Sequence, residues 1–255
     1  MLNVYALCCA RTSAPRRIFY PEDTSDTQII FPVPSFLVRH DKGNVLFDTG
    51  VDCYAQQDLV GRLGERVAKN FFIHSAPDEN MLAQLAKLQM KPDDITHVIN
   101  SHFHWDHCGC NFLFPRARFF VQRAEMQAAR AGHITYNPFQ WDHPFDYQLL
   151  DGEHDIFGDG TLLLFPTPGH TAGHQSLRVR AGRGVDLVFT ADACYTQEHL
   201  EHEIVPAATS AWSPEATVES FRKFRALQER EGCVLLFGHD ARQWETLRRA
   251  PDTLV

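Results

Sequence analysis

Three histidines and one aspartate lie within six residues of this chain, in the run Ser101-His-Phe-His-Trp-Asp-His107. Imidazole and carboxylate side chains are ligands that suit zinc or iron(II). The run directly follows Ile95 to Asn100, whose apolar residues predict a buried strand, so its side chains lie where the chain changes direction and ligands can converge. One tetrahedral ion cannot use all four ligands, because the adjacent Asp106 and His107 diverge from the two earlier histidines. The run therefore indicates two metal ions close together.

Further ligand-type side chains recur downstream, each beside small or turn residues and each directly after a predicted strand. They are His170 in Pro-Gly-His, Asp192 in Thr-Ala-Asp and His239 in Gly-His-Asp. A single pair of this kind is an ordinary turn in most proteins. Here a ligand-type residue beside a small or turn residue occurs three times, downstream of a dense His/Asp run. The residues alone therefore predict a metal centre assembled from separate loops.

The spacing of apolar residues predicts the elements that must position these side chains. Strands are expected at residues 36–39, 45–47, 95–100, 118–121, 162–165, 175–180, 185–190 and 234–237, with a further strand in the first ten residues. Helices are expected at 78–90 and 123–130. A third helix should start at the N-cap Ser213 with Pro214 in its first position and run to about Glu231. Strands followed by a helix, twice over, predict a β core in two layers with helices on its outer faces.

Gly132 to Gly152 is a long segment rich in aromatic residues, for which the sequence predicts no regular structure. A loop of that size in a compact domain is usually functional. Alternatively, its aromatic side chains close a small secondary hydrophobic core. Gly132 to Tyr147 and the earlier segment Val51 to His74 are expected to line a ligand pocket. A turn is expected at 182–184, where Gly182-Arg-Gly184 joins two strands.

Length and composition limit the class of protein. The 255 residues, 44% hydrophobic and 22% charged, predict a single globular domain spanning 1–255. The net charge of -8 disfavours nucleic acid as a partner. No apolar run approaches the ~18 residues of a transmembrane helix, and the N-terminus lacks the basic region of a secretory leader. The odd number of cysteines disfavours a disulfide framework, so a cytoplasmic location without membrane contact is expected.

The H-x-H-x-D-H run, with the three downstream ligands in order behind it, resembles the motifs of the metallo-β-lactamase superfamily over essentially the whole chain. The resemblance implies an α/β fold, the αβ/βα four-layer sandwich, with a dinuclear metal site between its halves. It also implies two Zn2+ ions per chain, with Fe, Co or Mn as alternative divalent metals. By position, the first metal would take His102, His104 and His170, the second would take Asp106, His107 and His239, and Asp192 would bridge them.

A narrower resemblance lies around Asp192. Asp-Ala-Cys-Tyr-Thr places Tyr195 three residues further on, and Val234 to Asp240 completes a pattern similar to the N-acyl homoserine lactonase group of quorum-quenching enzymes. The resemblance implies a small-molecule lactone substrate, opened by a metal-bridging hydroxide. Tyr195 would donate a hydrogen bond to the developing oxyanion, and Asp106 would pass a proton to the leaving alkoxide. Alternatively, Tyr195 packs against its loop with its hydroxyl on the backbone. The oligomeric state stays open, and a homodimer is compatible with the sequence.

The same ligands leave other functions open. A phosphotriesterase, a phosphodiesterase or another lactonase would use the same bimetallic site; Tyr195 favours the lactonase, and the acidic charge disfavours a nuclease. A thioesterase of the glyoxalase II type needs a basic cluster near the C-terminus, where Arg242, Arg248 and Arg249 follow no pattern. A metal-dependent sensor is disfavoured, because a complete ligand set with an open metal position is suited to hydrolysis.

Four neighbouring residues carry weaker indications. Asp48 either orients a ligand histidine or caps its own turn. Cys108 and Cys110 are expected to be small buried residues rather than thiolate ligands. His174, four residues after His170, either supports a ligand or meets solvent.

Overall fold

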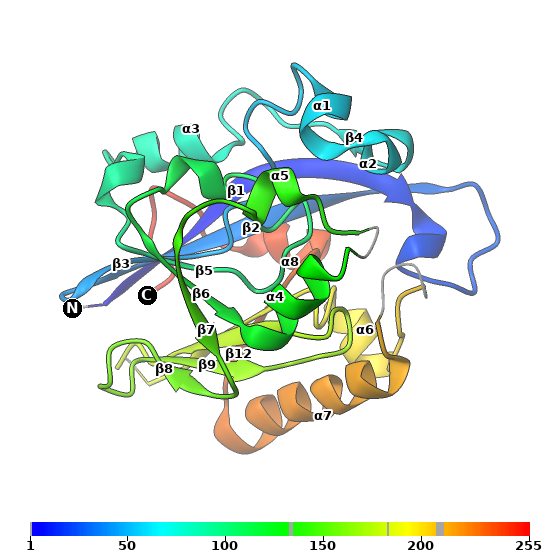
Figure 1. Cartoon of the computed structure of the whole chain (residues 1–255). Helices are drawn as coiled ribbons and strands as arrows, with labels where there is room; N and C mark the ends of the chain where they lie inside the picture. Colours follow the sequence, from blue (N-terminus) through cyan, green and yellow to red (C-terminus); the bar gives the residue numbers. More distant parts are fainter. Residues whose placement is uncertain (1, 133–134, 183, 208–211) are drawn as a thin grey trace.

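The computed structural model describes residues 2–132, 135–182, 184–207 and 212–255. Within these residues two β-sheets lie face to face (Figure 1). The first has the order β4-β1-β2-β3-β5-β6-β7 and contains β1 (Asn3–Pro15), β2 (Gln28–His40), β3 (Gly43–Phe47), β4 (Phe72–Ile73), β5 (His97–Ile99), β6 (Arg118–Gln122) and β7 (Asp146–Leu150). The second has the order β12-β11-β10-β9-β8 and contains β8 (His154–Asp155), β9 (Leu162–Pro166), β10 (Gln175–Val179), β11 (Leu187–Ala191) and β12 (Val234–Phe237).

The main core lies between the two sheets. Side chains alternate between the two faces of a strand, so every second residue of β2 and β3 points toward the second sheet. Phe36 stacks on Phe189 of β11 with ring centroids 4.1 Å apart, and Phe47 lies 5.6 Å from the same ring. Each fully buried side chain of this size contributes about 1.5–3 kcal/mol to folding. The apolar faces of the strands therefore hold the two halves together.

Helices cover the outer face of each sheet. Met81 and Leu85 of α3 (Met81–Lys87) join the core cluster formed by the outer face of the first sheet. Phe221 and Phe224 of α7 (Pro214–Glu231) do the same on the second sheet. This order of helix, sheet, sheet and helix confirms the predicted αβ/βα four-layer sandwich (Figure 1). The remaining helices are α1 (Leu59–Leu63), α2 (Glu65–Asn70), α4 (Arg123–Arg130), α5 (Pro138–Trp141), α6 (Gln197–His202), α8 (Ala241–Thr246) and the 3-10 turns η1 (Arg16–Ile18), η2 (Pro92–Asp94) and η3 (Asn111–Leu113).

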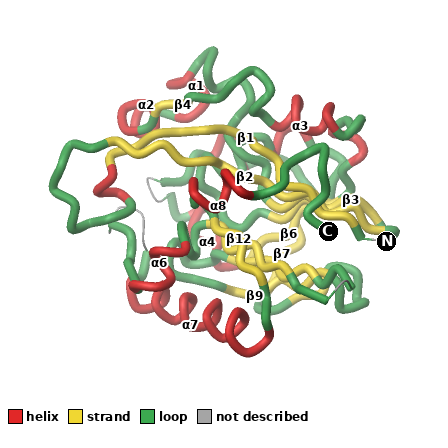
Figure 2. Tube along the Cα trace, turned by 180° about the vertical axis from the view of Figure 1, so that it is seen from behind, coloured by secondary structure: helices red, strands yellow, loops and turns green. Residues whose placement is uncertain are grey.

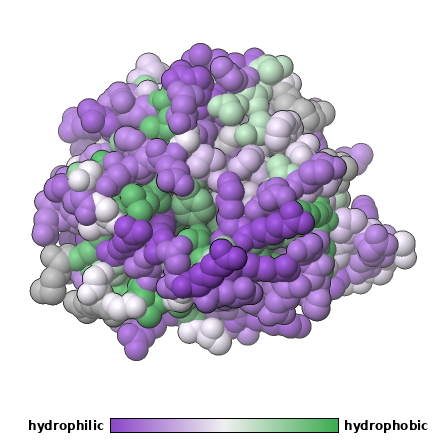
Figure 3. Space-filling model, turned by 90° about the horizontal axis from the view of Figure 1, so that it is seen from below, coloured by the Kyte–Doolittle hydropathy of each residue, from purple (hydrophilic) through white to green (hydrophobic). Residues whose placement is uncertain are grey.

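The predicted bounds of α7 are confirmed. The side chain of Ser213 accepts a hydrogen bond from the N–H of Ala216, and Gly232 ends the helix with φ +67°. A glycine is favoured there because a left-handed conformation costs a residue with a Cβ atom more. The surface seen from below in the orientation of Figure 1, the side on which α7 lies, is mainly hydrophilic (Figure 3). This matches a helix with one buried and one solvated face.

The expectation that 132–152 has no regular structure is wrong. Most of it is described, and it contains α5 and the edge strand β7, which pairs in parallel with β6. The sequence Asp-Tyr-Gln-Leu-Leu of β7 does not alternate clearly between polar and apolar residues, because this edge strand is only partly buried. The helix expected at 78–90 is shorter than predicted, since Asn80 caps its start and Gln89, with φ 56°, lies beyond its end. The turn expected at 182–184 includes residue 183, which lies outside the described residues.

The two ends of the chain lie side by side, as Figures 1 and 2 both show. The N–H of Leu254 donates a hydrogen bond of 2.7 Å to the carbonyl of Val4.

All seven cysteines are free. Among the described helices, none has the length and apolar character needed to cross a membrane.

Candidate metal centre

Loops at the ends of β5, β9, β11 and β12 bring all seven predicted ligands into one buried cluster. The H-x-H-x-D-H run lies between β5 and η3, and each downstream ligand follows the strand that the sequence predicted before it. Candidate ligand atoms lie within 4.8 Å of one another in three overlapping groups: His102, His104 and His170; His102, His107 and Asp192; Asp106, His107 and His239. Residues up to 137 positions apart in the chain, from 102 to 239, therefore form one centre.

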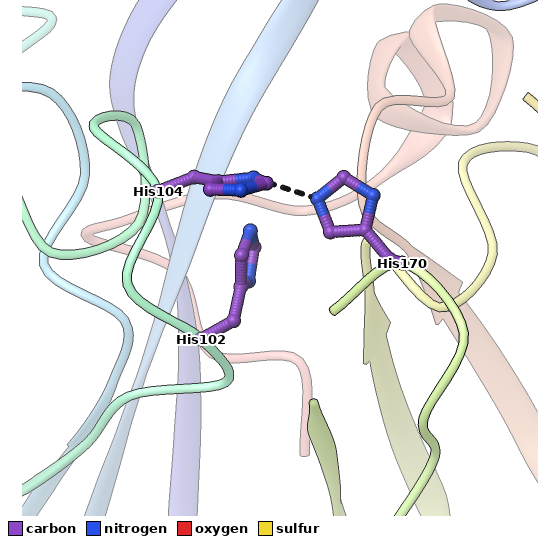
Figure 4. A group of neighbouring side chains, drawn as sticks. All are labelled: His102, His104 and His170. Carbon is purple, nitrogen blue, oxygen red and sulfur yellow. Dashed lines mark hydrogen bonds between the residues drawn. The ribbon is translucent and has the colours of Figure 1, made fainter. Parts of the chain in front are cut away.

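His102, His104 and His170 converge from two loops, as Figure 4 shows. Nδ1 of His104 lies 2.8 Å from Nε2 of His170, the contact drawn as a dashed line. Oδ2 of Asp192 lies 3.3 Å from the same nitrogen of His170 and 3.9 Å from Nε2 of His102. Three ring nitrogens and one carboxylate oxygen thus surround a common point.

The other oxygen of Asp192 faces the second group. Oδ1 lies 2.9 Å from Nε2 of His107 and 3.0 Å from Nε2 of His239. Oδ2 of Asp106 is 3.7 Å from each of these two nitrogens. Asp192 therefore lies between the two groups with one oxygen toward each, which is the position that a bridging carboxylate requires.

Gly238 allows β12 to deliver His239 to this place. A Cβ atom at Gly238 would lie 2.5 Å from the carbonyl oxygen of Ala191 and 3.1 Å from Oδ1 of Asp192. Only a residue without a side chain permits that approach. The glycine in Gly-His-Asp is therefore required by the packing of β12 against β11, and it sets His239 beside Asp192.

Asp48 orients two of the imidazoles. Its Oδ2 accepts a hydrogen bond of 2.8 Å from Nδ1 of His107 and one of 2.7 Å from the hydroxyl of Ser101. The oxygen of Ser101 in turn lies 2.9 Å from Nδ1 of His102. With both Nδ1 atoms donating, the Nε2 lone pairs point to the centre of the cluster, as metal ligands need. Two roles were expected for Asp48, and the structure shows the first of them, contact with a candidate ligand histidine.

The donor set fits divalent metal ions. Nε2 of His102, Nε2 of His107 and Oδ1 of Asp192 are buried and have no aligned hydrogen-bond partner among the described residues. Buried polar atoms without partners are costly and rare in native proteins, so three in one cluster need an explanation. Histidine nitrogens and carboxylate oxygens are ligands for zinc and related metals. A metal ion in each group would satisfy these atoms.

Burial and neighbouring charges shift the pKa values of the imidazoles in two different directions. Burial, together with neighbouring imidazoles, lowers the pKa of His102 and His104 well below 6.5. These rings are therefore neutral at pH 7, the form that binds metal. Burial also acts to lower the pKa of His107, but the carboxylates of Asp192, Asp106 and Asp48 raise it well above 6.5. The negative charge of three carboxylates around His107 favours a positive charge at this place, and a divalent metal ion would supply it.

Glu125 is a residue near the centre that the sequence did not single out. It is fully buried on α4, and its carboxylate accepts hydrogen bonds from the N–H of Phe103, the hydroxyl of Thr171 and the N–H of Gly173. It thereby ties the loop of His102 and His104 to the loop of His170. An acidic residue in the first turn of a helix is common because it interacts favourably with the helix dipole, so no pattern in the sequence indicates this contact.

Tyr195 lies beside the cluster. Its side chain is 4% exposed, and its hydroxyl is 3.4 Å from Nδ1 of His170. Its ring packs 4.6 Å from Phe19 and 5.4 Å from His239, measured between centroids. The tyrosine therefore faces both groups of candidate ligands.

The remaining neighbours are buried. Cys108 and Cys110 are fully buried free thiols outside the three ligand groups, in agreement with the expectation of packing residues. His174 is also fully buried, so the expected alternative of solvent contact is wrong. Its ring lies 5.1 Å from that of His102, and its Nδ1 is hydrogen-bonded to Thr167.

A cavity of about 630 Å3 opens onto the cluster. His104, Asp106, His170, Asp192, Tyr195 and His239 line its base. One wall comes from residues 61–71, another from residues 135–138, and both fall within the segments expected to line a pocket. Phe19 and Phe31, from the first part of the chain, were not predicted and complete an apolar side. A small molecule with an apolar part fits such a site.

The profile of the metallo-beta-lactamase superfamily matches residues 29–239. The chain belongs to the metallo-β-lactamase superfamily, as the H-x-H-x-D-H run indicated. N-acyl homoserine lactonase AttM of Azorhizobium caulinodans is 35% identical over 232 residues, covering 86% of this chain and 86% of that protein. N-acyl homoserine lactonase AiiA of Bacillus thuringiensis is 30% identical over 221 residues, covering 87% and 86%. These relatives confirm the narrower resemblance to the lactonase group.

Solved structures agree with the sequence comparison. An N-acyl homoserine lactone hydrolase with N-hexanoyl-L-homoserine bound at its catalytic metal centre is 26% identical, with a TM-score of 0.89 over 98% of both chains. A variant of B. thuringiensis AiiA with N-decanoyl-L-homoserine bound at its active site is 27% identical, again with a TM-score of 0.89 over 98% of both chains. The fold of this chain is that of the metallo-β-lactamase superfamily.

Proposed function

We propose that this protein is a dinuclear metal hydrolase that opens the lactone ring of N-acyl homoserine lactones, with zinc as the metal. One observation carries the proposal: a cavity with an apolar side ends on a cluster of seven candidate ligands with the hydroxyl of Tyr195 beside it. The lactonases among the relatives and structural neighbours support the substrate class.

The proposed ligand sets follow the two groups of the cluster. His102, His104 and His170 hold the first ion, and Asp106, His107 and His239 hold the second. Asp192 bridges them, supported by the contacts of its two oxygens with opposite groups. Two ions held there would supply a hydroxide nucleophile at neutral pH and polarise the lactone carbonyl.

The chain's own residues guide the rest of the reaction. The hydroxyl of Tyr195 donates a hydrogen bond to the oxyanion that develops on the carbonyl oxygen. Asp106 accepts the proton of the attacking hydroxide and passes it to the leaving alkoxide as the ring C–O bond breaks, which gives an open hydroxy acid. Phe19, Phe31 and Trp105 line the cavity and hold the acyl chain away from water. Two of these aromatic rings, Phe19 and Phe31, pack only 4.8 Å apart.

A pH-stat assay of the purified, zinc-loaded protein tests the proposal. Homoserine lactones of graded acyl length are compared with paraoxon and S-lactoylglutathione, and proton release is expected from the lactones. His170→Gln should abolish the reaction, whereas His202→Gln, a change at an exposed histidine of α6, should not affect it. Proton release from paraoxon or the thioester alone would overturn the proposal in favour of a phosphotriesterase or a thioesterase.

Three wider features belong to the same proposal. Seven free cysteines support a reducing, cytoplasmic setting. A single domain over 1–255 and a homodimer stay predictions, which limited proteolysis and light scattering would check.

A further inference from the structure

Arg62 lies in α1 between two residues of the pocket wall, Gly61 and Leu63. Among the described residues that line the cavity, Arg62 itself does not appear. Its side chain is only 26% exposed. A long charged side chain buried to this extent beside a pocket, without lining it, indicates a role in holding the wall.

Three aromatic rings surround the guanidinium of Arg62. Its central carbon lies 5.1 Å from the ring centroid of Tyr54, 5.6 Å from that of Phe112 and 5.4 Å from that of Phe139. These distances fall within the range of cation–π attraction. The rings come from the loop before α1, from η3 and from α5. Tyr54 and Phe139 are themselves partly exposed, so core burial alone does not explain their positions.

Two polar contacts fix the same residue. Nη1 of Arg62 lies 3.2 Å from Oδ2 of Asp52, whose side chain is completely buried. The carbonyl oxygen of Arg62 accepts a hydrogen bond of 3.1 Å from Nδ2 of Asn137. Asn137 lines the cavity and also caps α5, since its side chain accepts from the N–H of Phe139. Arg62 therefore contacts the opposite wall through its main chain, at Asn137, and the adjoining Phe139 of α5 through its side chain.

We propose that Arg62 is a positioning residue that joins the wall at 61–71 to the wall at 135–138 and so sets the affinity for the acyl part of the substrate. The proposal rests on the proposed function for its substrate. Arginine suits this role because its flat, delocalised cation can stack on several rings and still pair with a carboxylate. A lysine ammonium at the same place would be a compact point charge without the stacking surface.

Kinetics of Arg62→Met and Arg62→Lys with lactones of short and long acyl chains test the proposal. If the walls separate, binding of the long chain weakens equally in ground and transition states. We expect KM for the long-chain lactone to rise ~10-fold in Arg62→Met, with kcat within ~2-fold and little change for the short chain. Arg62→Lys should lie between wild type and Arg62→Met. The matched control is Arg116→Met, which removes a guanidinium 78% exposed and 3.5 Å from Asp93.

Hydrogen exchange gives a readout that does not depend on turnover. Arg62→Met should increase amide exchange in both 59–71 and 135–142, while metal content stays that of wild type. Exchange that rises only within α1, or KM values that change by the same factor for both chain lengths, would overturn the proposal. If the wild type opens no lactone, the proposed function fails, and the exchange of the two segments still decides whether Arg62 joins the walls.

Discussion

At the scale of single residues, Asp48 shows how one carboxylate can prepare a metal centre. It has φ 59°, a conformation that few residues other than glycine and asparagine or aspartate adopt. That backbone geometry directs its side chain to Ser101 and His107. These contacts hold the ligand nitrogens in the orientation that a metal ion requires.

Asp48→Asn should weaken metal binding. An amide retains the size of the side chain but replaces one acceptor oxygen with a donor, which opposes Nδ1–H of His107. Loss of such a supporting contact lowers metal affinity by about 10–100-fold. Competition with a chromophoric chelator measures the change, and Asp93→Asn at a half-exposed carboxylate serves as control. Equal affinity in Asp48→Asn and wild type would show that Asp48 only shapes its turn.

Tyr195→Phe separates metal binding from catalysis. The ring and its contact with Phe19 remain, but the hydroxyl beside His170 is lost. We expect kcat for the lactone to fall by ~10–1000-fold, the range for losing one oxyanion donor. Metal content, measured by elemental analysis, should not change. Full activity in this variant would contradict the assigned role.

At the scale of elements, α4 secures the loops of the first ligand group. Gly173 packs so close to this helix that a Cβ atom would lie 2.0 Å from the backbone nitrogen of Glu125. The buried carboxylate of Glu125 then links both loops. The position of His170 relative to His102 therefore depends on a helix that supplies no ligand.

Glu125→Gln should loosen this arrangement. The glutamine amide places a donor where Thr171 and Gly173 also donate, so at least one buried hydrogen bond is lost. The expected fall in the free energy of unfolding is about 1–3 kcal/mol, measured by urea denaturation. Glu219→Gln, a change at a carboxylate 64% exposed on α7, is the control. A midpoint equal to that of wild type would show that the carboxylate does not tie the loops.

At the scale of the whole molecule, the candidate centre joins the two halves of the sandwich. The run after β5 belongs to the first sheet, whereas His170, Asp192 and His239 follow strands of the second. An ion held by ligands from both sheets binds only the folded chain. Metal binding should therefore stabilise the fold as a whole.

Removal of metal should lower the melting temperature. A ligand present at 100 times its dissociation constant stabilises the native state by about 2.7 kcal/mol. Dialysis against a chelator should lower Tm, and added zinc should restore it. His170→Gln should show a smaller response than wild type, since one ligand of the first group is missing. A Tm that is the same with and without chelator would argue against a bound metal in the native protein.

Much of the fold and nearly all of the candidate centre could be predicted from local patterns. Ser213 and Pro214 predicted the start of α7, and the H-x-H-x-D-H run predicted the cluster. Edge strand β7 was missed because partial burial removes the alternation that marks a strand. Glu125 was missed because its partners are backbone N–H groups and a hydroxyl from distant loops.

Patterns along the chain predict which side chains are suited to bind metal and which strand each one follows, because ligand chemistry and apolar periodicity are local properties. The folded arrangement is needed to see that Asp192 turns one oxygen to each group, that Asp48 orients two imidazoles, and that Arg62 lies among three rings. Those relations depend on the packing of two sheets and on backbone atoms brought together from distant positions. The spacing of residues along the chain does not predict such contacts.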